Sequence, residues 1–202
     1  MKPIFSTFLF CFICTGLFAQ TPAKLLADTK TIAQANKVVK NYPQLDAKMF
    51  MLFSNKDTSD ITLPLFAKKN GFTFSIDNYS YKIIDSITYP EFRASYIYLD
   101  GNQLSLKSID SIRNIILAKF KNGSSFFDLV KEYTMDGNPT GDLGWFTESM
   151  MAKEFETAIR QHKKDDIFTI DIPENKWYYV TLKTFDDRKV KELAVLKIKT
   201  GH

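Results

Sequence analysis

Apolar residues recur along the chain with two periods, one typical of helices and one typical of strands. Residues 21–40 place Leu25, Ile32 and Val38 among polar residues at roughly helical spacing, and a proline soon afterwards ends the pattern. This spacing predicts one N-terminal helix. The segment 45–53 is also apolar, but its pattern does not distinguish a helix from a strand.

Two alternating apolar runs follow at 72–76 and 79–87. The first run places Phe72, Phe74 and Ile76 on one face, and a short polar turn separates it from the second. Alternation of this kind is typical of strands, so we predict a β-hairpin.

The second half of the chain predicts a strand, then three helices, then further strands. This order indicates an α+β fold, with helices packed around a small antiparallel sheet. The predicted elements are a strand at 92–99, a helix capped by Ser108 and closed at Asn122-Gly123, a second helix opened by Ser125, a glycine-rich loop from Asp136 to Gly144, a third helix from about Met151, and strands at 167–172 and 177–185. Residues 190–199 either add an edge strand or stay loosely ordered.

A proline at position 90 suggests where the chain divides. Proline has no amide hydrogen to donate to a sheet ladder, so we place a break at Tyr89-Pro90-Glu91. Residues 20–90 then form a smaller N-terminal helix and hairpin segment, 91–187 form the second domain, and 188–202 form a C-terminal strand or tail.

The first nineteen residues resemble a secretory signal peptide. Lys2 gives a basic start, the stretch from Ile4 to Phe18 is mostly apolar, and Ala19 ends a small-residue cleavage site. An apolar run of about 15 residues is shorter than the roughly 20 that span a bilayer, which disfavours a membrane anchor. A lipid anchor is disfavoured because neither Cys11 nor Cys14 follows the small residues that such attachment requires. We expect export to a periplasmic or extracellular location.

Composition excludes several classes of function. Cys11 and Cys14 are the only cysteines and precede the expected cleavage site, so the mature chain has no disulfide and no thiolate site. His162 and His202 lack partners at metal-ligand spacing, so we expect neither metal nor cofactor. The net charge of +4 is spread without a dense basic stripe, which disfavours nucleic-acid binding. The 18 phenylalanines and 9 tyrosines predict a large aromatic core or exposed aromatics used in recognition.

Several short motifs stand in one register along the second half of the chain. They are ASYIYL at 94–99, NGSSF at 122–126, YTMD at 133–136, GDLGWF at 141–146, and MM at 150–151 followed by EFETA at 154–158. In this combination, residues 91–187 resemble a parvulin, or PpiC-type, rotamase domain.

The resemblance implies a peptidyl-prolyl cis-trans isomerase that acts as an exported folding factor on X-Pro bonds. Its partners would be unfolded or extended polypeptides that contain proline. Uncatalysed X-Pro isomerisation takes tens to hundreds of seconds, and it can limit folding. The alternative is a catalytically weak or inactive relative that serves as a chaperone or peptide-binding module.

Four residues match the positions that bind substrate in this family. The resemblance implies that Leu143, Met151 and Phe155 line the pocket for the proline ring; the structural alternative is that all three are ordinary core residues. Asp136 matches a position beside the substrate carbonyl, and its alternative role is that of a turn residue before Gly137.

The chain departs from the family at two further positions. The family places histidines on the first and last strands of the site, and this chain has tyrosine at the corresponding positions, which we assign to Tyr96 and Tyr178. Phenol can donate and accept a hydrogen bond as neutral imidazole does, but it does not titrate near neutral pH. We therefore assign catalytic positions to Asp136, Tyr96 and Tyr178, with chemistry by shape and dipoles, without protonation of histidine.

Overall fold

The computed structural model describes residues 21–201, and the expected signal peptide at 1–19 lies outside them. The described residues form two compact units. The first unit contains residues 21–51, 68–85 and 194–201, and the second unit contains residues 52–67 and 86–193. No helix within 21–201 combines the length and apolarity needed to cross a membrane.

The first unit begins with two helices where the sequence predicted one. They are α1 (Pro22–Asp28) and α2 (Ile32–Asn41). Thr31 caps α2 by accepting a hydrogen bond from the Gln34 amide, while the Gln34 side chain accepts one from the Thr31 amide. This reciprocal capping box starts a new helix within the apolar pattern, so the prediction of a single helix is wrong.

The rest of the first unit is mainly β-structure. A 3-10 turn, η1 (Pro43–Leu45), leads into β1 (Lys48–Phe53), which resolves the ambiguous segment as a strand. The predicted hairpin is confirmed: β2 (Thr73–Ile76) pairs with the start of β3 (Tyr79–Asp100), and Phe74 lies opposite Tyr81. The core of this unit comprises Leu25, Leu26, Ala35, Val38, Ala47, Ile84, Leu196 and Ile198.

Two strands are longer or better ordered than the sequence predicted. β3 continues through Pro90 without interruption, so the predicted break in secondary structure there is wrong. Proline lacks only the amide donor, and a strand can accommodate it where no ladder bond is needed. β7 (Arg188–Lys199) is a full strand that lies between β1 and β3 in the strand order, so it is neither an edge nor a loose tail.

The second unit is an α+β fold, as predicted. Its strands are the later part of β3, β4 (Asp142–Phe146), β5 (Ile167–Ile172), β6 (Trp177–Lys183) and the start of β7. Its helices are α3 (Leu106–Lys121), α4 (Phe126–Tyr133), α5 (Lys153–Gln161) and the short 3-10 turns η2 (Leu63–Ala67) and η3 (Pro173–Asn175). β3 pairs with β4 and β6, and β6 pairs with β5, all antiparallel.

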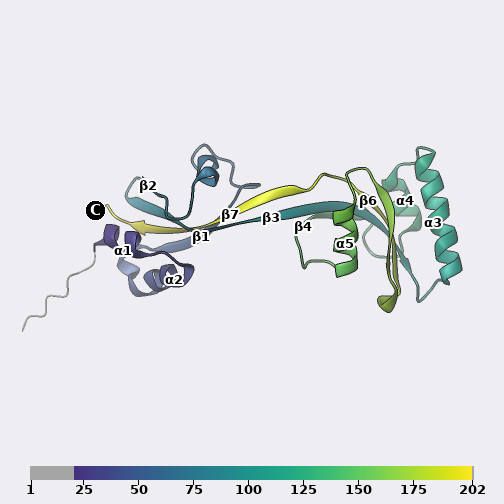
Figure 1. The fold of residues 1–202 in the computed structure, drawn as a ribbon, viewed down its shortest axis with the longest axis horizontal. Helices are drawn as coiled ribbons and strands as arrows, with labels where there is room; N and C mark the ends of the chain where they lie inside the picture. Colours follow the sequence, from purple (N-terminus) through teal and green to yellow (C-terminus); the bar gives the residue numbers. More distant parts are fainter. Residues whose placement is uncertain (1–20, 202) are drawn as a thin grey trace, which may run out of the picture. The chain divides into compact units, whose positions relative to one another are not determined.

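Alternation along the strands gives this sheet two faces, each covered by helices. One face packs Ile97, Leu99 and Val180 against α3 and α4. The opposite face packs Phe92, Ala94, Phe146, Phe168, Ile170 and Ile172 against Phe155 and Ile159 of α5. Figure 1 shows α3 and α4 on one side of β6 and α5 on the other. A side chain of β3 or β6 therefore reaches one layer or the other according to whether its position is odd or even.

Two local predictions in this unit need correction. The cap of α3 is Ser105, whose hydroxyl accepts from the Ser108 amide, so Ser108 lies in the first turn of the helix. The predicted glycine-rich loop includes the start of β4, which pairs with β3 through Asp142 opposite Ser95. Both errors concern an element boundary, where several polar residues fit the same local signal.

Candidate functional site

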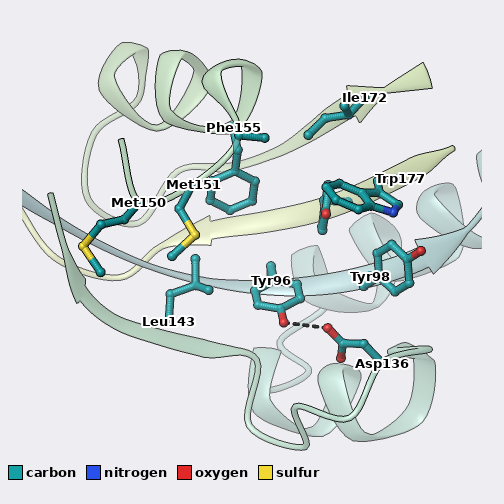
Figure 2. A pocket seen from close by; sticks show the side chains of 11 residues that line it. Tyr96, Tyr98, Asp136, Leu143, Met150, Met151, Phe155, Ile172 and Trp177 are labelled. Carbon is teal, nitrogen blue, oxygen red and sulfur yellow. Dashed lines mark hydrogen bonds between the residues drawn. The ribbon is translucent and has the colours of Figure 1, made fainter. Parts of the chain in front are cut away.

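A pocket of about 540 Å³ opens on the α5 face of the sheet in the second unit. Its size lies within the range of about 300–1,000 Å³ typical of sites for small ligands. It is lined by Tyr96, Tyr98, Asp136, Leu143, Met150, Met151, Ala152, Phe155, Ile172, Trp177 and Tyr179, most of which are labelled in Figure 2.

The floor of the pocket is built from cross-strand pairs of β3 and β6. Tyr98 lies opposite Tyr179, with ring centroids 5.5 Å apart. Tyr96 meets the Tyr179 ring edge-on at 5.7 Å, and Phe155 of α5 meets it edge-on at 5.4 Å. Aromatic rings in contact at these spacings form a rigid apolar surface because edge-to-face packing satisfies the ring quadrupoles.

One end of the pocket is aliphatic and contains the three residues predicted to hold a proline ring. Leu143 of β4, Met151 and Phe155 lie around one hollow beside Tyr96 (Figure 2). Phe155 is 5% exposed, whereas Leu143 and Met151 are half-buried. We call this part the aliphatic end. Its three side chains come from a strand, a loop and a helix.

A hydrogen-bonded pair lies beside the aliphatic end. The Tyr96 hydroxyl donates to Asp136 Oδ2 at 2.6 Å, as the dashed line in Figure 2 marks. The other carboxylate oxygen accepts from the Thr134 hydroxyl at 3.0 Å and from the Asn138 amide at 3.2 Å. Asp136 is therefore held in one orientation by three donors, while it also lines the pocket.

Burial raises the pKa of two floor tyrosines above the ordinary value near 10. Burial, and then the hydrogen bond to Asp136, raise the pKa of Tyr96 to about 12. Burial also raises the pKa of Tyr179, and the charge of Asp136 adds to the effect. The Tyr179 hydroxyl has no hydrogen-bond partner among residues 21–201, so it is available as a donor to a bound molecule.

The structure places Tyr178 away from this pocket, which corrects its prediction as a site residue. Tyr178 is 7% exposed and belongs to the core under α3 and α4, together with Ile97 and Val180. Neighbouring residues of a strand face opposite sides, so an alignment that is wrong by one position selects the wrong layer. The tyrosine of β6 that faces the pocket is Tyr179.

Backbone geometry fixes the strand that carries Leu143. Gly141 has a φ of +63°, and a Cβ at this position would lie 2.3 Å from the Tyr96 carbonyl oxygen, which only glycine avoids. The Gly141 carbonyl accepts from the Tyr96 amide at 2.9 Å. Arg93 Nε donates to Asp142 Oδ1 at 3.1 Å, and this hydrogen bond holds the pKa of Asp142 below its usual value.

A buried glutamate fixes the loop that carries Met151. Glu156 is 8% exposed, and its Oε1 accepts from the amides of Met150 and Met151 at 3.0 and 3.1 Å. Burial alone would raise the pKa of Glu156, but the loop amides outweigh it and the pKa is lowered. Glu156 was not among the site residues predicted from the sequence, although a glutamate shortly after the start of a helix is a common partner for preceding amides.

Three residues at the far end of the pocket were not predicted from the sequence, namely Tyr98, Ile172 and Trp177. Strand alternation was the available signal, since Tyr98 shares a face with Tyr96. Within residues 21–201, no group of three histidine, cysteine, aspartate or glutamate side chains is placed to hold a metal ion.

Comparison with known proteins identifies the domain that contains this pocket. Residues 86–182 match the model of the PPIC-type PPIASE domain. The foldase protein PrsA of Geobacillus kaustophilus is 31% identical over 111 residues, which cover 54% of this chain and 36% of that protein. Foldase protein PrsA 1 of Bacillus cereus is 30% identical over 111 residues, covering 54% of this chain and 35% of that protein. The chain thus aligns with little more than a third of the length of either relative.

A solved structure gives a similar comparison. The peptidylprolyl isomerase PrsA of Bacillus anthracis is 29% identical, with a TM-score of 0.40, covering 48% of this chain and 42% of that one. The family model spans the strand with Tyr96, the loop with Asp136, and the GDLGWF and EFETA motifs. The domain at residues 86–182 belongs to the parvulin, or PPIC-type, family of peptidyl-prolyl isomerase domains.

Proposed function

We propose that this chain is a peptidyl-prolyl cis-trans isomerase that acts on X-Pro bonds of unfolded or extended polypeptides. One observation carries the proposal: an apolar hollow formed by Leu143, Met151 and Phe155 lies next to a fixed carboxylate–phenol pair, Asp136 and Tyr96. A proline ring needs an apolar site, and the amide that precedes it needs a polar environment suited to its twisted state.

The proposed activity lowers the barrier to rotation about the X-Pro amide bond. The planar amide is stabilised by resonance, and the barrier of about 18–20 kcal/mol arises because the twisted state loses that resonance. A site that holds the proline ring and surrounds the twisted carbonyl with fixed dipoles binds the transition state better than the planar substrate. No bond is broken, so neither a nucleophile nor a cofactor is required.

Tyr96 and Tyr179 have different roles in stabilising the twisted amide. Tyr96 donates to Asp136 and holds it in place. Tyr179 lines the pocket, and its protonated hydroxyl is the group suited to donate to a substrate carbonyl. Both phenols keep their protons at neutral pH, which supports electrostatic stabilisation without acid–base titration.

We propose further that the chain is exported and assists the folding of proteins outside the cytoplasm, in the periplasm or the extracellular space. The signal-peptide pattern at 1–19 and the similarity of residues 86–182 to foldase proteins support this location. Because the pocket must enclose a proline ring, its substrates are unfolded segments in which the proline is exposed.

The test measures cis-to-trans relaxation of short X-Pro peptides with the purified chain. Replacing Met151 with alanine should lower kcat/KM about tenfold, since removing part of a half-buried apolar side chain that lines the pocket costs about 1.4 kcal/mol. Met51→Ala, at an exposed position in the first unit, is the matched control and should leave the rate unchanged.

A second pair of variants tests the polar groups. Tyr96→Phe removes the hydroxyl that orients Asp136, and it should lower kcat by about tenfold while KM changes little. Tyr79→Phe removes a comparable bond, from Tyr79 to Asp46 at 2.9 Å, in the first unit, and should not affect catalysis. Relaxation at the rate of the buffer alone for the wild-type chain would refute the proposed activity.

A further inference from the structure

The pocket continues past the aliphatic end to a second set of side chains. Tyr98, Ile172 and Trp177 line its other end, which we call the aromatic end (Figure 2). Trp177 lies opposite Ile172 of β5 and opposite Asp100 of β3. The rotation of a prolyl amide at the aliphatic end makes no use of these side chains.

The aromatic end has the character of a binding surface. Ile172 is 1% exposed and forms a buried base, whereas Trp177 is 39% exposed, although it is a large aromatic residue. The Trp177 indole N–H has no hydrogen-bond partner among residues 21–201. An exposed ring with an unused donor suits a peptide because it offers apolar contact to a side chain and a hydrogen bond to a carbonyl.

The spacing of the floor residues matches that of a peptide. Tyr179, a floor residue whose ring contacts Phe155 of the aliphatic end, lies two positions from Trp177 on β6, a separation of about 6.6–6.8 Å. Side chains two positions apart in an extended peptide point the same way with the same spacing. A chain with its proline at the aliphatic end therefore presents a nearby side chain to Trp177.

The charge of the lining limits which side chain fits. Asp136 is the one charged residue among the described residues that line the pocket. An acidic or phosphorylated side chain would meet this carboxylate with no cation among the lining residues to offset it, and it would lose water against apolar rings.

We propose that the aromatic end selects X-Pro segments that carry an aromatic or large aliphatic side chain within two positions of the proline, and disfavours acidic or phosphorylated ones there. This inference rests on the proposed isomerase site, and it specifies the class of polypeptide that the site prefers. Segments that become buried when a protein folds have this character, and their apolar side chains are exposed before folding.

The experiment compares peptides that place phenylalanine, leucine, alanine, glutamate or phosphoserine at each of the two positions on either side of proline. For the full chain, kcat/KM at the best position should be about two- to tenfold higher with phenylalanine than with alanine, the range that aromatic contacts provide. Glutamate and phosphoserine should fall below alanine. Equal rates for phenylalanine and alanine at every position, or a preference for phosphoserine, would overturn the proposal.

Substitutions of Trp177 test whether the aromatic end causes the preference for phenylalanine peptides. Trp177→Ala should bring the ratio of phenylalanine to alanine peptides close to one, and Trp177→Phe should retain most of it. Phe127→Ala removes an aromatic ring of similar exposure, 46%, on α4 outside the pocket, and should leave both the ratio and the rates unchanged. A ratio that survives in Trp177→Ala would contradict the assignment.

Measuring peptide binding tests this inference independently of the proposed isomerase activity. If the full chain accelerates no peptide, the isomerase proposal fails, and the same peptides compared by their Kd still test the aromatic end. Tighter binding of phenylalanine peptides that disappears in Trp177→Ala would sustain the selection. Equal Kd values for phenylalanine and alanine peptides would refute it.

Discussion

Tyr96 and Tyr179 give the site a chemical character that differs from that of a histidine pair. Burial raises the pKa of both hydroxyls, and together with the hydrogen bond to Asp136 it raises that of Tyr96 to about 12. A phenol of this kind donates a hydrogen bond at any physiological pH, whereas imidazole gains a charge near neutrality. At the residue scale, the site is thus built from permanent dipoles and one fixed carboxylate.

The raised pKa of Tyr96 predicts how stability depends on pH. An unfolded tyrosine loses its proton near pH 10, while folded Tyr96 keeps its proton to about pH 12. The native state therefore binds more protons in this interval, and the free energy of unfolding should fall as the pH rises from about 10 to about 12. Urea denaturation at several pH values measures this decline.

Tyr96→Phe provides the control for that measurement. Other tyrosines with raised pKa contribute to the same decline, among them Tyr98 and Tyr179. The variant should show a shallower decline than the wild type, and the difference isolates Tyr96. Identical slopes for the two proteins between pH 10 and pH 12 would show that Tyr96 has no special environment in the native state.

At the scale of elements, the pocket depends on short connections held by specific hydrogen bonds. β4 carries Leu143 and is anchored by Arg93 and by the close approach of Gly141 to β3. The loop before α5 carries Met151 and is anchored by Glu156. These connections set the width of the aliphatic end, because its side chains come from elements that do not pair with each other.

Glu156→Ala tests the role of the loop before α5. The change leaves two amides without their acceptor, so it should lower the free energy of unfolding by about 1–3 kcal/mol. It should also raise KM for X-Pro peptides more than it lowers kcat, because Met151 loses its fixed position. Both quantities can be measured on one preparation, by urea denaturation and by the relaxation assay.

Glu154→Ala is the matched control, since Glu154 lies in the same first turn of α5 but is exposed. Its stability and KM should match those of the wild type. Glu156→Gln keeps an acceptor oxygen and should recover most of the KM. A normal KM in Glu156→Ala would mean that the loop holds its shape without this carboxylate.

At the scale of the whole molecule, the pocket lies entirely within the second unit, since its lining residues fall between Tyr96 and Tyr179. The segment 52–67 also belongs to this unit, although it is distant in sequence. Lys191 Nζ donates to the Phe66 carbonyl at 2.8 Å, and the Ser54 amide donates to the Lys191 carbonyl at 2.9 Å. The second unit is therefore assembled from two separate parts of the chain.

A fragment of residues 86–193 should therefore fold with an intact pocket but with reduced stability. It lacks the segment 52–67 and so loses at least four hydrogen bonds, made by the Ser54 amide and hydroxyl, the Asn55 side chain and the Phe66 carbonyl. At about 1 kcal/mol each, this loss should lower the free energy of unfolding by at least about 4 kcal/mol. Thermal unfolding measures the loss, and peptide titration measures the pocket. A folded fragment that no longer binds the peptides of the full chain would show that the pocket depends on residues outside 86–193.

Local patterns in the sequence were enough to predict most elements and the family of the domain. The positions of α4, α5, β5 and β6 follow from apolar periods and turn residues, because those signals act over a few neighbouring residues. The GDLGWF, MM and EFETA motifs predicted Leu143, Met151 and Phe155 as site residues, and the structure brings these three to one pocket. Asp136 and Tyr96 were also identified from the sequence, and they are hydrogen-bonded to each other.

Tertiary structure alone decided the features that depend on partners distant in sequence. Tyr178 and Tyr179 carry the same side chain, and only the pairing of β6 with β3 determines which one faces the pocket. β7 is an interior strand because β1 and β3 flank it, and β3 continues past Pro90 as part of the same sheet. The chemical preference of each residue is local, but the face it occupies is set by strand register, and register is fixed when the whole sheet assembles.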